Sequence, residues 1–278
     1  MVDKNIIMRL LKSTTTIPTM WLLKKYFTTT GTITIDDRGL VSCTGDVVLK
    51  IDMKHERLPV SFDKVDGYFW CNENRLTTLE GAPQSVGRKF WCSNNQLTSL
   101  EHCPQIVGGD FDCYHNRLKT LEHSPQSVVG SFKCYSNQLT TLEGAPKSVG
   151  GDFSCYNNQL TTLEHSPQRV GGHFVCDGNR LTTLEHAPKS VGTNFYCSKN
   201  KLTTLEGLPV VPGKLMLSYS PTLPLLRCLL AQKVEFYPEL RDKTVQTILN
   251  QYAGQGEAGA FACGAELATA GFKENARW

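Results

Sequence analysis

Hydrophobic positions recur with a period of 21 residues through the middle of this chain. Seven successive copies each carry a cysteine at the same position, from Cys71 to Cys197, with a phenylalanine two residues before it. Leucines follow five and eight residues after each cysteine, and mostly polar residues lie between them. A strict period of about 20–50 residues is typical of a solenoid, in which each copy packs on the next. We therefore expect an extended array whose long surface binds a partner.

Each copy has the pattern of a short strand followed by a turn. Phe153 and Cys155 lie two residues apart, so both should point to the interior, where Leu160 and Leu163 join them. Asn158 should bond backbone groups in the turn, and its equivalents should form an amide ladder along the stack. The short copy leaves little room for a helix. We expect a curved parallel sheet on the concave side and irregular, proline-fixed backbone on the convex side.

Residues 1–64 are expected to form a mixed cap before the repeats of residues 65–215. A helix is predicted over residues 18–27, where proline lies in the first turn and glycine follows the end. Short strands are predicted over residues 32–35 and 47–51, which alternate in polarity. The first residues, 1–11, lack the apolar core and cleavage site of a secretory leader.

Residues 216–278 are expected to hold a degenerate last repeat and a small helical cap. Met216 is placed in the phenylalanine column and Ser218 in the cysteine column. Apolar residues at helical spacing then predict helices near residues 225–230, 238–252 and 257–272.

Composition narrows the class of protein further. The 29 basic and 26 acidic residues nearly balance and are spread along the chain, which disfavours a nucleic-acid or membrane-surface protein. Seven of the 11 cysteines form the repeat column, and their spacing lacks the close pairs of metal sites. We interpret them as a buried thiol ladder, which requires a reducing compartment and predicts a cytoplasmic protein without a metal or cofactor.

The segment Asn-Asn-Gln-Leu-Thr-Ser-Leu at residues 94–100 resembles leucine-rich repeats of the short type found in secreted bacterial effectors. The cysteine-containing copy of 21 residues is also similar to repeat proteins encoded by bacteriophages and some bacteria. The final segment, residues 273–278, resembles the end of such phage arrays. The resemblance covers residues 65–215. It implies a leucine-rich-repeat solenoid that binds and inhibits a host-cell protein, such as a defence or regulatory factor.

Outward positions of the predicted strands carry aromatic residues where other copies have serine, asparagine or aspartate. Clustered exposed aromatic residues are typical of a binding hot spot, so we predict a protein partner here. The alternatives are that the stacked rings only stabilise the sheet, that the face forms a homo-oligomer, or that the rings stack bases of single-stranded nucleic acid. Four aspartates against two lysines on this face disfavour the last. The predicted contact residues are Tyr68, Trp70, Trp91, Asp112, Tyr114, Lys133, Tyr135, Tyr156 and Tyr196.

Three further patterns do not support an enzyme. Residues 254–259 match Gly-x-Gly-x-x-Gly but follow a predicted helix, whereas a dinucleotide site follows a strand. Histidines recur after the repeat glutamates, as at His102 and His165, but glycine interrupts the column. Cys228 and Cys263 lie in a tail that holds no histidine to act as their base. We therefore predict a non-enzymatic binding protein without catalytic residues.

Overall fold

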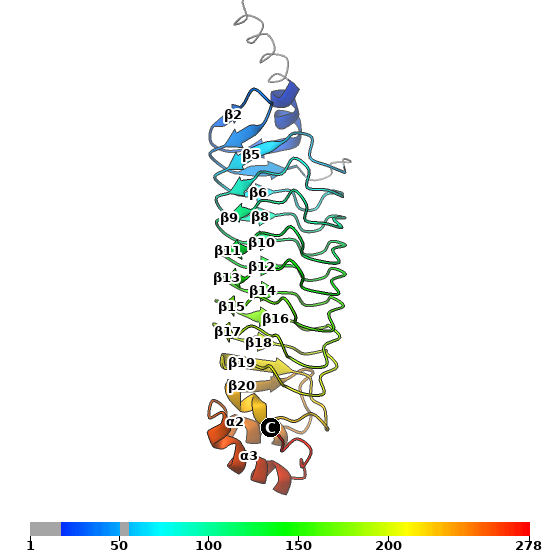
Figure 1. Cartoon of the computed structure of the whole chain (residues 1–278), viewed down its shortest axis with the longest axis vertical. Coiled ribbons are helices and arrows are strands. Elements are labelled where there is room, and N and C mark those ends of the chain that lie inside the picture. The colour runs from blue at the N-terminus through cyan, green and yellow to red at the C-terminus, as the bar shows by residue number, and fades with distance from the viewer. Residues whose placement is uncertain (1–17, 51–55) are drawn as a thin grey trace, which may run out of the picture.

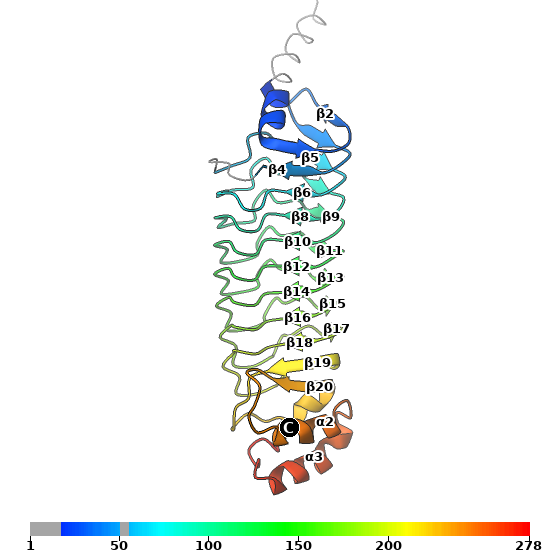
Figure 2. The same cartoon turned by 180° about the vertical axis from the view of Figure 1, so that it is seen from behind.

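The computed structural model describes residues 18–50 and 56–278, so the predictions for residues 1–11 and 51 lie outside the described part. Figures 1 and 2 show a parallel β-solenoid, a column of stacked turns that ends in short helices. Within the described residues, no helix combines the length and apolar character required to cross a membrane.

One long sheet, here called the Phe sheet, runs along the column. Parallel neighbours pair in register, so that Phe111 lies beside Phe132 and Asp112 beside Lys133. The β1 strand alone pairs antiparallel, with β4. Eleven strands make up the sheet in this order: β1 (Phe27–Thr29), β4 (Val47–Leu49), β6 (Phe69–Trp70), β8 (Phe90–Trp91), β10 (Phe111–Asp112), β12 (Phe132–Lys133), β14 (Phe153–Ser154), β16 (Phe174–Val175), β18 (Phe195–Tyr196), β19 (Val211–Leu217) and β20 (Ala231–Phe236).

Strands also form on a second side of the column, where the sequence predicted irregular backbone. Two shorter sheets, here called the Val sheets, follow one another along this side. The first contains, in order, β2 (Ile33–Ile35), β3 (Val41–Cys43), β5 (Phe62–Val65), β7 (Ser85–Val86) and β9 (Ile106–Val107). The second contains β11 (Ser127–Val128), β13 (Ser148–Val149), β15 (Arg169–Val170) and β17 (Ser190–Val191).

Glycine follows five of the Val-sheet strands, β7, β9, β13, β15 and β17, and permits this close stacking. A Cβ on Gly150 would lie 2.1 Å from the carbonyl oxygen of Val129, one turn earlier. Because both sides of the column carry strands, both have the same spacing of about 4.8 Å per turn, and no wedge bends the stack. Figures 1 and 2 accordingly show the turns rising in a straight column, so the outward face of the Phe sheet is a strip and not the predicted hollow.

The interior of each turn is filled as the sequence predicts. Phe153, Cys155, Leu160 and Leu163 are fully buried. Neighbouring phenylalanine rings of the column have centroids 5.1–5.8 Å apart. Burial raises the pKa of the Cys155 thiol, because the interior disfavours the thiolate. The cysteine column therefore packs as small neutral side chains.

The N-terminal part joins the column before the first complete repeat. Residues 18–26 are helical, and β1 follows, close to the predicted helix boundaries. The predicted strands appear as β2 and β4. Val47 pairs in parallel with Phe69, so the Phe sheet extends upstream of residue 65. The division into cap and repeat at residue 64 stays a prediction.

The last turns are shorter than the repeat, which shifts the register by one residue. Phe195 pairs with Leu215, and Leu215 and Leu217 are fully buried in the phenylalanine and cysteine columns. The assignment of Met216 and Ser218 to these columns is therefore wrong. Because successive strand residues point to opposite faces, the slip turns Met216 outward. The sequence analysis also did not predict β20, which lies one turn further on.

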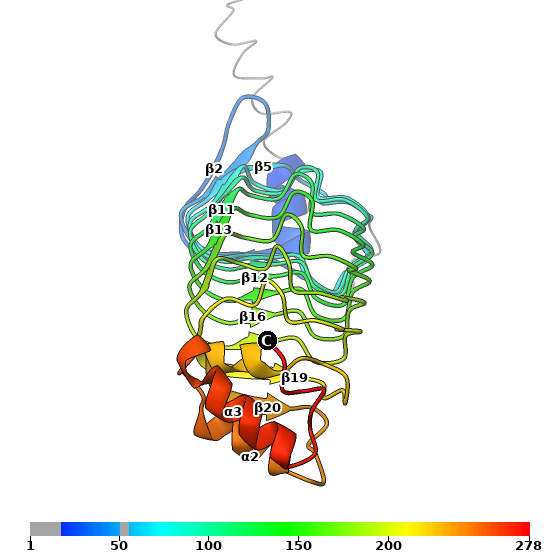
Figure 3. The same ribbon diagram turned by 60° about the horizontal axis from the view of Figure 1, so that its bottom comes forward.

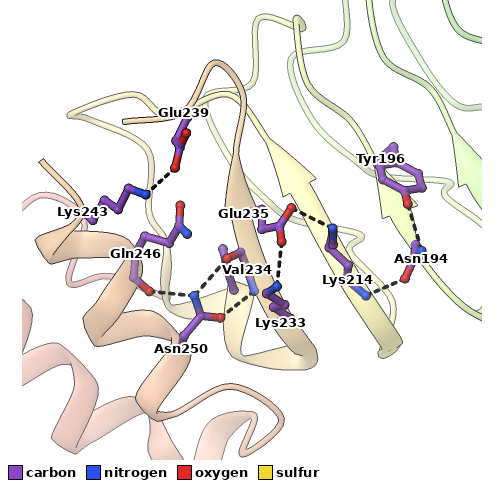
Figure 4. A network of polar contacts seen from close by, with 10 residues as sticks. All are labelled: Asn194, Tyr196, Lys214, Lys233, Val234, Glu235, Glu239, Lys243, Gln246 and Asn250. Carbon is purple, nitrogen blue, oxygen red and sulfur yellow. Dashed lines mark hydrogen bonds and ion pairs between the residues drawn. The ribbon is translucent and has the colours of Figure 1, made fainter. Parts of the chain in front are cut away.

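Short helices lie across the end of the column in Figure 3. A 3-10 helix, η1 (Leu226–Leu230), precedes β20, and α2 (Thr244–Gln251) and α3 (Glu257–Thr269) follow it. Helix α2 begins six residues after the predicted position, where the Asp242 carboxylate accepts the Thr244 N–H at 2.9 Å. Asn250 of α2 accepts the Val234 N–H and donates to the Val234 carbonyl (Figure 4), so its amide pairs with the edge of β20.

Candidate functional site

The predicted contact residues all lie on the outward side of the Phe sheet, because they flank the inward phenylalanine and cysteine of each strand. The structure does not bring them into one cluster. It separates them into a tryptophan group near β6 and β8, a tyrosine stack beyond β10, β12 and β14, and Tyr196 on β18.

The tryptophan group contains Tyr68, Trp70 and Trp91. The Trp70 ring meets Tyr68 at 5.7 Å between centroids and Trp91, edge to face, at the same distance. The Lys89 ammonium lies 4.3 Å from the centroid of the Trp91 ring. All three rings are partly exposed, so the group presents an aromatic surface with a cation beside it.

Asp112 lies beside this group, in register with Trp91 on the neighbouring strand, and is buried. Its side chain is 2% exposed, and Lys89 Nζ lies 2.5 Å from its Oδ2, with Lys133 Nζ 3.9 Å from Oδ1. Burial raises the pKa of Asp112, and the hydrogen bond from Lys89 opposes that rise. Asp112 is therefore not exposed at the predicted outward position, and its carboxylate lies close to two lysines, of which Lys133 is 32% exposed. A part for Asp112 in partner contact stays a prediction.

Three tyrosines stack face to face across consecutive turns. The Tyr114 and Tyr135 rings are 4.4 Å apart and 7° from parallel, and Tyr135 and Tyr156 are 4.3 Å apart and 11° from parallel. Burial and the two neighbouring phenols raise the pKa of Tyr135, so all its contacts favour the neutral phenol. The stack is partly exposed along its length and forms a flat aromatic ridge.

Tyr196 makes a separate group with its neighbours on the same face. Its hydroxyl accepts a hydrogen bond from Asn194 Nδ2 at 2.9 Å, and the His173 ring meets it edge to face at 5.8 Å. Asn194 in turn accepts the Lys214 N–H, and Lys214 pairs with Glu235 of β20 (Figure 4). The Tyr196 ring is thus held in a polar network that continues to the last strand.

A pocket that the sequence did not reveal lies where the tyrosine stack ends. Its volume is about 290 Å³, and its walls include Tyr156 and Tyr237, with Asp177 and Ser198 between them. Tyr237 follows buried Phe236 of β20, as Tyr156 follows buried Cys155, so it belongs to the same outward column. Sequence reasoning missed it because the shortened last turns remove Tyr237 from the period of 21 residues.

The histidine column has a conformational explanation. His102, His123, His165 and His186 have φ between 63° and 68°, and glycine takes this left-handed corner in the other copies. Histidine is among the non-glycine residues enriched in this region. At Gly144 the corner packs closer to the preceding turn, and the Leu121 N–H donates to the Glu143 carbonyl at 2.8 Å. The choice between histidine and glycine therefore follows the packing of the corner.

The remaining chemical motifs lie outside any site. Gly254 and Gly256 turn the chain between α2 and α3, without the strand that a dinucleotide motif requires. Within residues 18–50 and 56–278, no three histidine, cysteine or acidic side chains are grouped as metal ligands would be. Cys228 and Cys263 are buried thiols.

No protein-family model and no curated protein matches this chain.

Proposed function

We propose that this chain is a non-enzymatic binding protein that recognises another protein through the outward face of the Phe sheet. The tyrosine stack carries the proposal. Equivalent positions in other turns hold Asn72, Ser93, Asp177 and Ser198, so the fold accepts small polar residues where the three rings occur. Large, partly exposed rings with few rotatable bonds are the side chains that dominate the energy of protein interfaces.

The surrounding charges favour a protein over a nucleic acid. Lys89 is engaged by Asp112 and by the Trp91 ring, so it is not free to neutralise phosphate. Asp110, Asp152 and Asp177 add negative charge along the face, which would repel a polyanion. The proposed contact residues are the partly exposed members of the predicted set, which leaves out buried Asp112: Tyr68, Trp70, Trp91, Tyr114, Lys133, Tyr135, Tyr156 and Tyr196.

We further infer that the turns are of a leucine-rich type and that the terminal segments act as caps. The Phe-x-Cys-x-x-Asn-x-Leu pattern supports the first inference, and the pairing of Asn250 with the edge of β20 supports the second. The resemblance to phage-encoded repeats makes a host-cell protein the expected partner, which binding would inhibit in the cytoplasm.

Affinity capture from bacterial lysate tests the function. The wild type is compared with the triple variant Tyr114→Ser, Tyr135→Ser, Tyr156→Ser, which copies the serine found in other turns. A matched control, Ile106→Ser with Val129→Ser, removes two residues that are each 69% exposed near the Val sheets. We expect one protein to be captured by the wild type and the control, and to bind the triple variant at least about tenfold more weakly. Equal capture by all three would refute the proposed face.

Self-association is the second candidate, because the same aromatic strip could bury itself against a second copy. Sedimentation of the wild type and the triple variant separates the two. A wild-type dimer that becomes a monomer in the triple variant would favour self-association, and a monomer in both would favour a different partner.

A further inference from the structure

The tyrosine stack ends at an open ring face of Tyr156. Tyr135 covers one side of Tyr156 at 4.3 Å. On its other side the next two turns place Asp177 and Ser198 in the column, and the pocket of about 290 Å³ occupies this gap. Met216 and Lys199 line it as well, and Tyr237 bounds its far end. A flat guest group can therefore continue the stack beyond Tyr156.

The polar groups of the pocket favour a hydrogen-bond donor. Asp177 Oδ1 accepts the Ser198 N–H at 2.7 Å, which fixes the carboxylate and leaves it capacity for further donors. The Ser198 hydroxyl is buried beside this carboxylate. Burial raises the pKa of Asp177, because the interior disfavours the charged carboxylate.

We propose that this pocket receives the guanidinium group of an arginine side chain presented by the partner protein. This step rests on the proposed function. A guanidinium is planar, stacks on aromatic faces and presents five N–H donors, so it meets both Tyr156 and Asp177. Charge-assisted bonds between guanidinium and carboxylate are stronger than neutral ones.

Other guest groups fit the pocket less well. A neutral aromatic ring would stack on Tyr156 but would cover a charged carboxylate without pairing it, which is costly. A lysine ammonium would neutralise Asp177 but has no flat face for the ring. Lys199 places its own ammonium 4.7 Å from the centroid of the Tyr237 ring. Its positive charge opposes a cationic guest, so Lys199→Asn should strengthen guanidinium binding; asparagine also suits the left-handed backbone there, as at Asn157.

The test uses the full chain and small probes, without a partner. N-acetyl-arginine methylamide is titrated by NMR or calorimetry beside the citrulline analogue, which is equally flat but uncharged, and the lysine analogue. We expect the arginine probe to bind with a Kd of about 1 mM, as suits a fragment of this size. Asp177→Asn should weaken it about tenfold.

Asp152→Asn is the matched control. Asp152 Oδ1 accepts the His173 N–H at 2.7 Å, which copies the bond of Asp177, but Asp152 does not line the pocket. Its variant should bind the arginine probe like the wild type. The inference is overturned if the citrulline or lysine probe binds as tightly as arginine, or if the two asparagine variants weaken binding equally.

Partner capture then separates this inference from the proposed function. A partner that is lost in the tyrosine triple variant but retained by Asp177→Asn would leave the binding function standing and overturn the arginine pocket. If the arginine probe binds but no captured protein requires the tyrosine stack, the guanidinium cannot be assigned to a protein partner. That result would also overturn the proposed function.

Discussion

The side chain of Asn158 accepts the backbone N–H of Leu139, which lies one turn earlier in the column, at 3.0 Å. The same amide donates to the carbonyls of Cys134 and Cys155, at 3.2 Å and 2.9 Å. One buried side chain thus satisfies polar backbone groups in two successive turns. Equivalent asparagines make the same contacts from Asn95 to Asn200.

Replacing Asn158 with alanine should destabilise the chain by about 3 kcal/mol. The substitution leaves the N–H groups of Asn137 and Leu139 without the acceptor that Asn158 provides, whereas the carbonyls of Cys134 and Cys155 keep bonds from Asn137 and Asn179. Each unsatisfied group costs about 1–3 kcal/mol, part of which relaxation recovers. Urea denaturation followed by circular dichroism measures the change. Gln138→Ala, an exposed substitution on a neighbouring turn, should alter stability by less than about 0.5 kcal/mol. Equal effects of the two substitutions would show that the ladder is not a source of stability.

The glycine corners should tolerate a side chain much less well than the histidine corners. A Cβ on Gly144 would lie 2.4 Å from the Leu121 carbonyl, and its φ is 83°. Gly144→Ala should therefore cost more than about 2 kcal/mol. His165 already carries a Cβ at φ 66°, so His165→Ala should cost less than about 1 kcal/mol.

Thermal unfolding of both variants measures the difference between the corners. A larger loss of thermal stability in His165→Ala than in Gly144→Ala would mean that the imidazole makes a stabilising interaction. The histidine column would then have a role beyond its backbone conformation.

The strict period is the part of the fold that the sequence could predict. Phe153, Cys155, Leu160, Leu163 and the asparagine ladder occupy the expected positions, because a buried column repeats only if each copy meets the same neighbours. The Val sheets could not be predicted from the sequence. A strand of two residues is too short to show an alternation of apolar and polar residues, and it forms only because glycine permits the turns to approach closely. The straightness of the column follows from those strands and was missed with them.

The site was predictable only where it follows the period. The aromatic residues of the repeats fall on one face as expected, but Asp112 is buried under Lys89, which depends on side-chain geometry and not on register. Tyr237 was not predicted, because the last turns are shorter than 21 residues. A shift of one residue moves every later side chain to another column.

The cysteine column should be chemically silent in the folded chain. All 11 thiols are free and buried. Burial raises the pKa of Cys103 to about 12, and desolvation acts in the same direction on Cys155, so the reactive thiolate is scarce at neutral pH. A thiol titration with Ellman's reagent at pH 8 should find little reaction before unfolding and 11 reactive thiols after denaturation in guanidinium. Rapid reaction of several thiols in the native chain would contradict the packed column.

Asp177 should make stability depend on pH in a defined direction. Burial raises its pKa above the ordinary 3.8, and the Ser198 N–H opposes the rise. A carboxyl with a raised pKa binds a proton more readily in the folded state than in the unfolded state. Its charge therefore lowers the stability of the fold by the full amount at pH values above its folded pKa, and this loss disappears below its unfolded pKa. Asp177→Asn keeps an oxygen for the Ser198 N–H and removes the charge. It should therefore be more stable than the wild type at pH 7, and this gain should shrink as the pH falls toward about 3.8.

Thermal melts of the wild type and Asp177→Asn between pH 3 and pH 8 measure this effect. Asp63→Asn, which removes an exposed carboxylate from β5, controls for the change in net charge and should show no comparable gain at pH 7. A loss of stability in Asp177→Asn at pH 7 would mean that the charge is already compensated in the free protein. The carboxylate would then gain less from a guanidinium guest. We therefore expect Asp177→Asn both to raise the melting temperature at pH 7 and to weaken binding of the arginine probe.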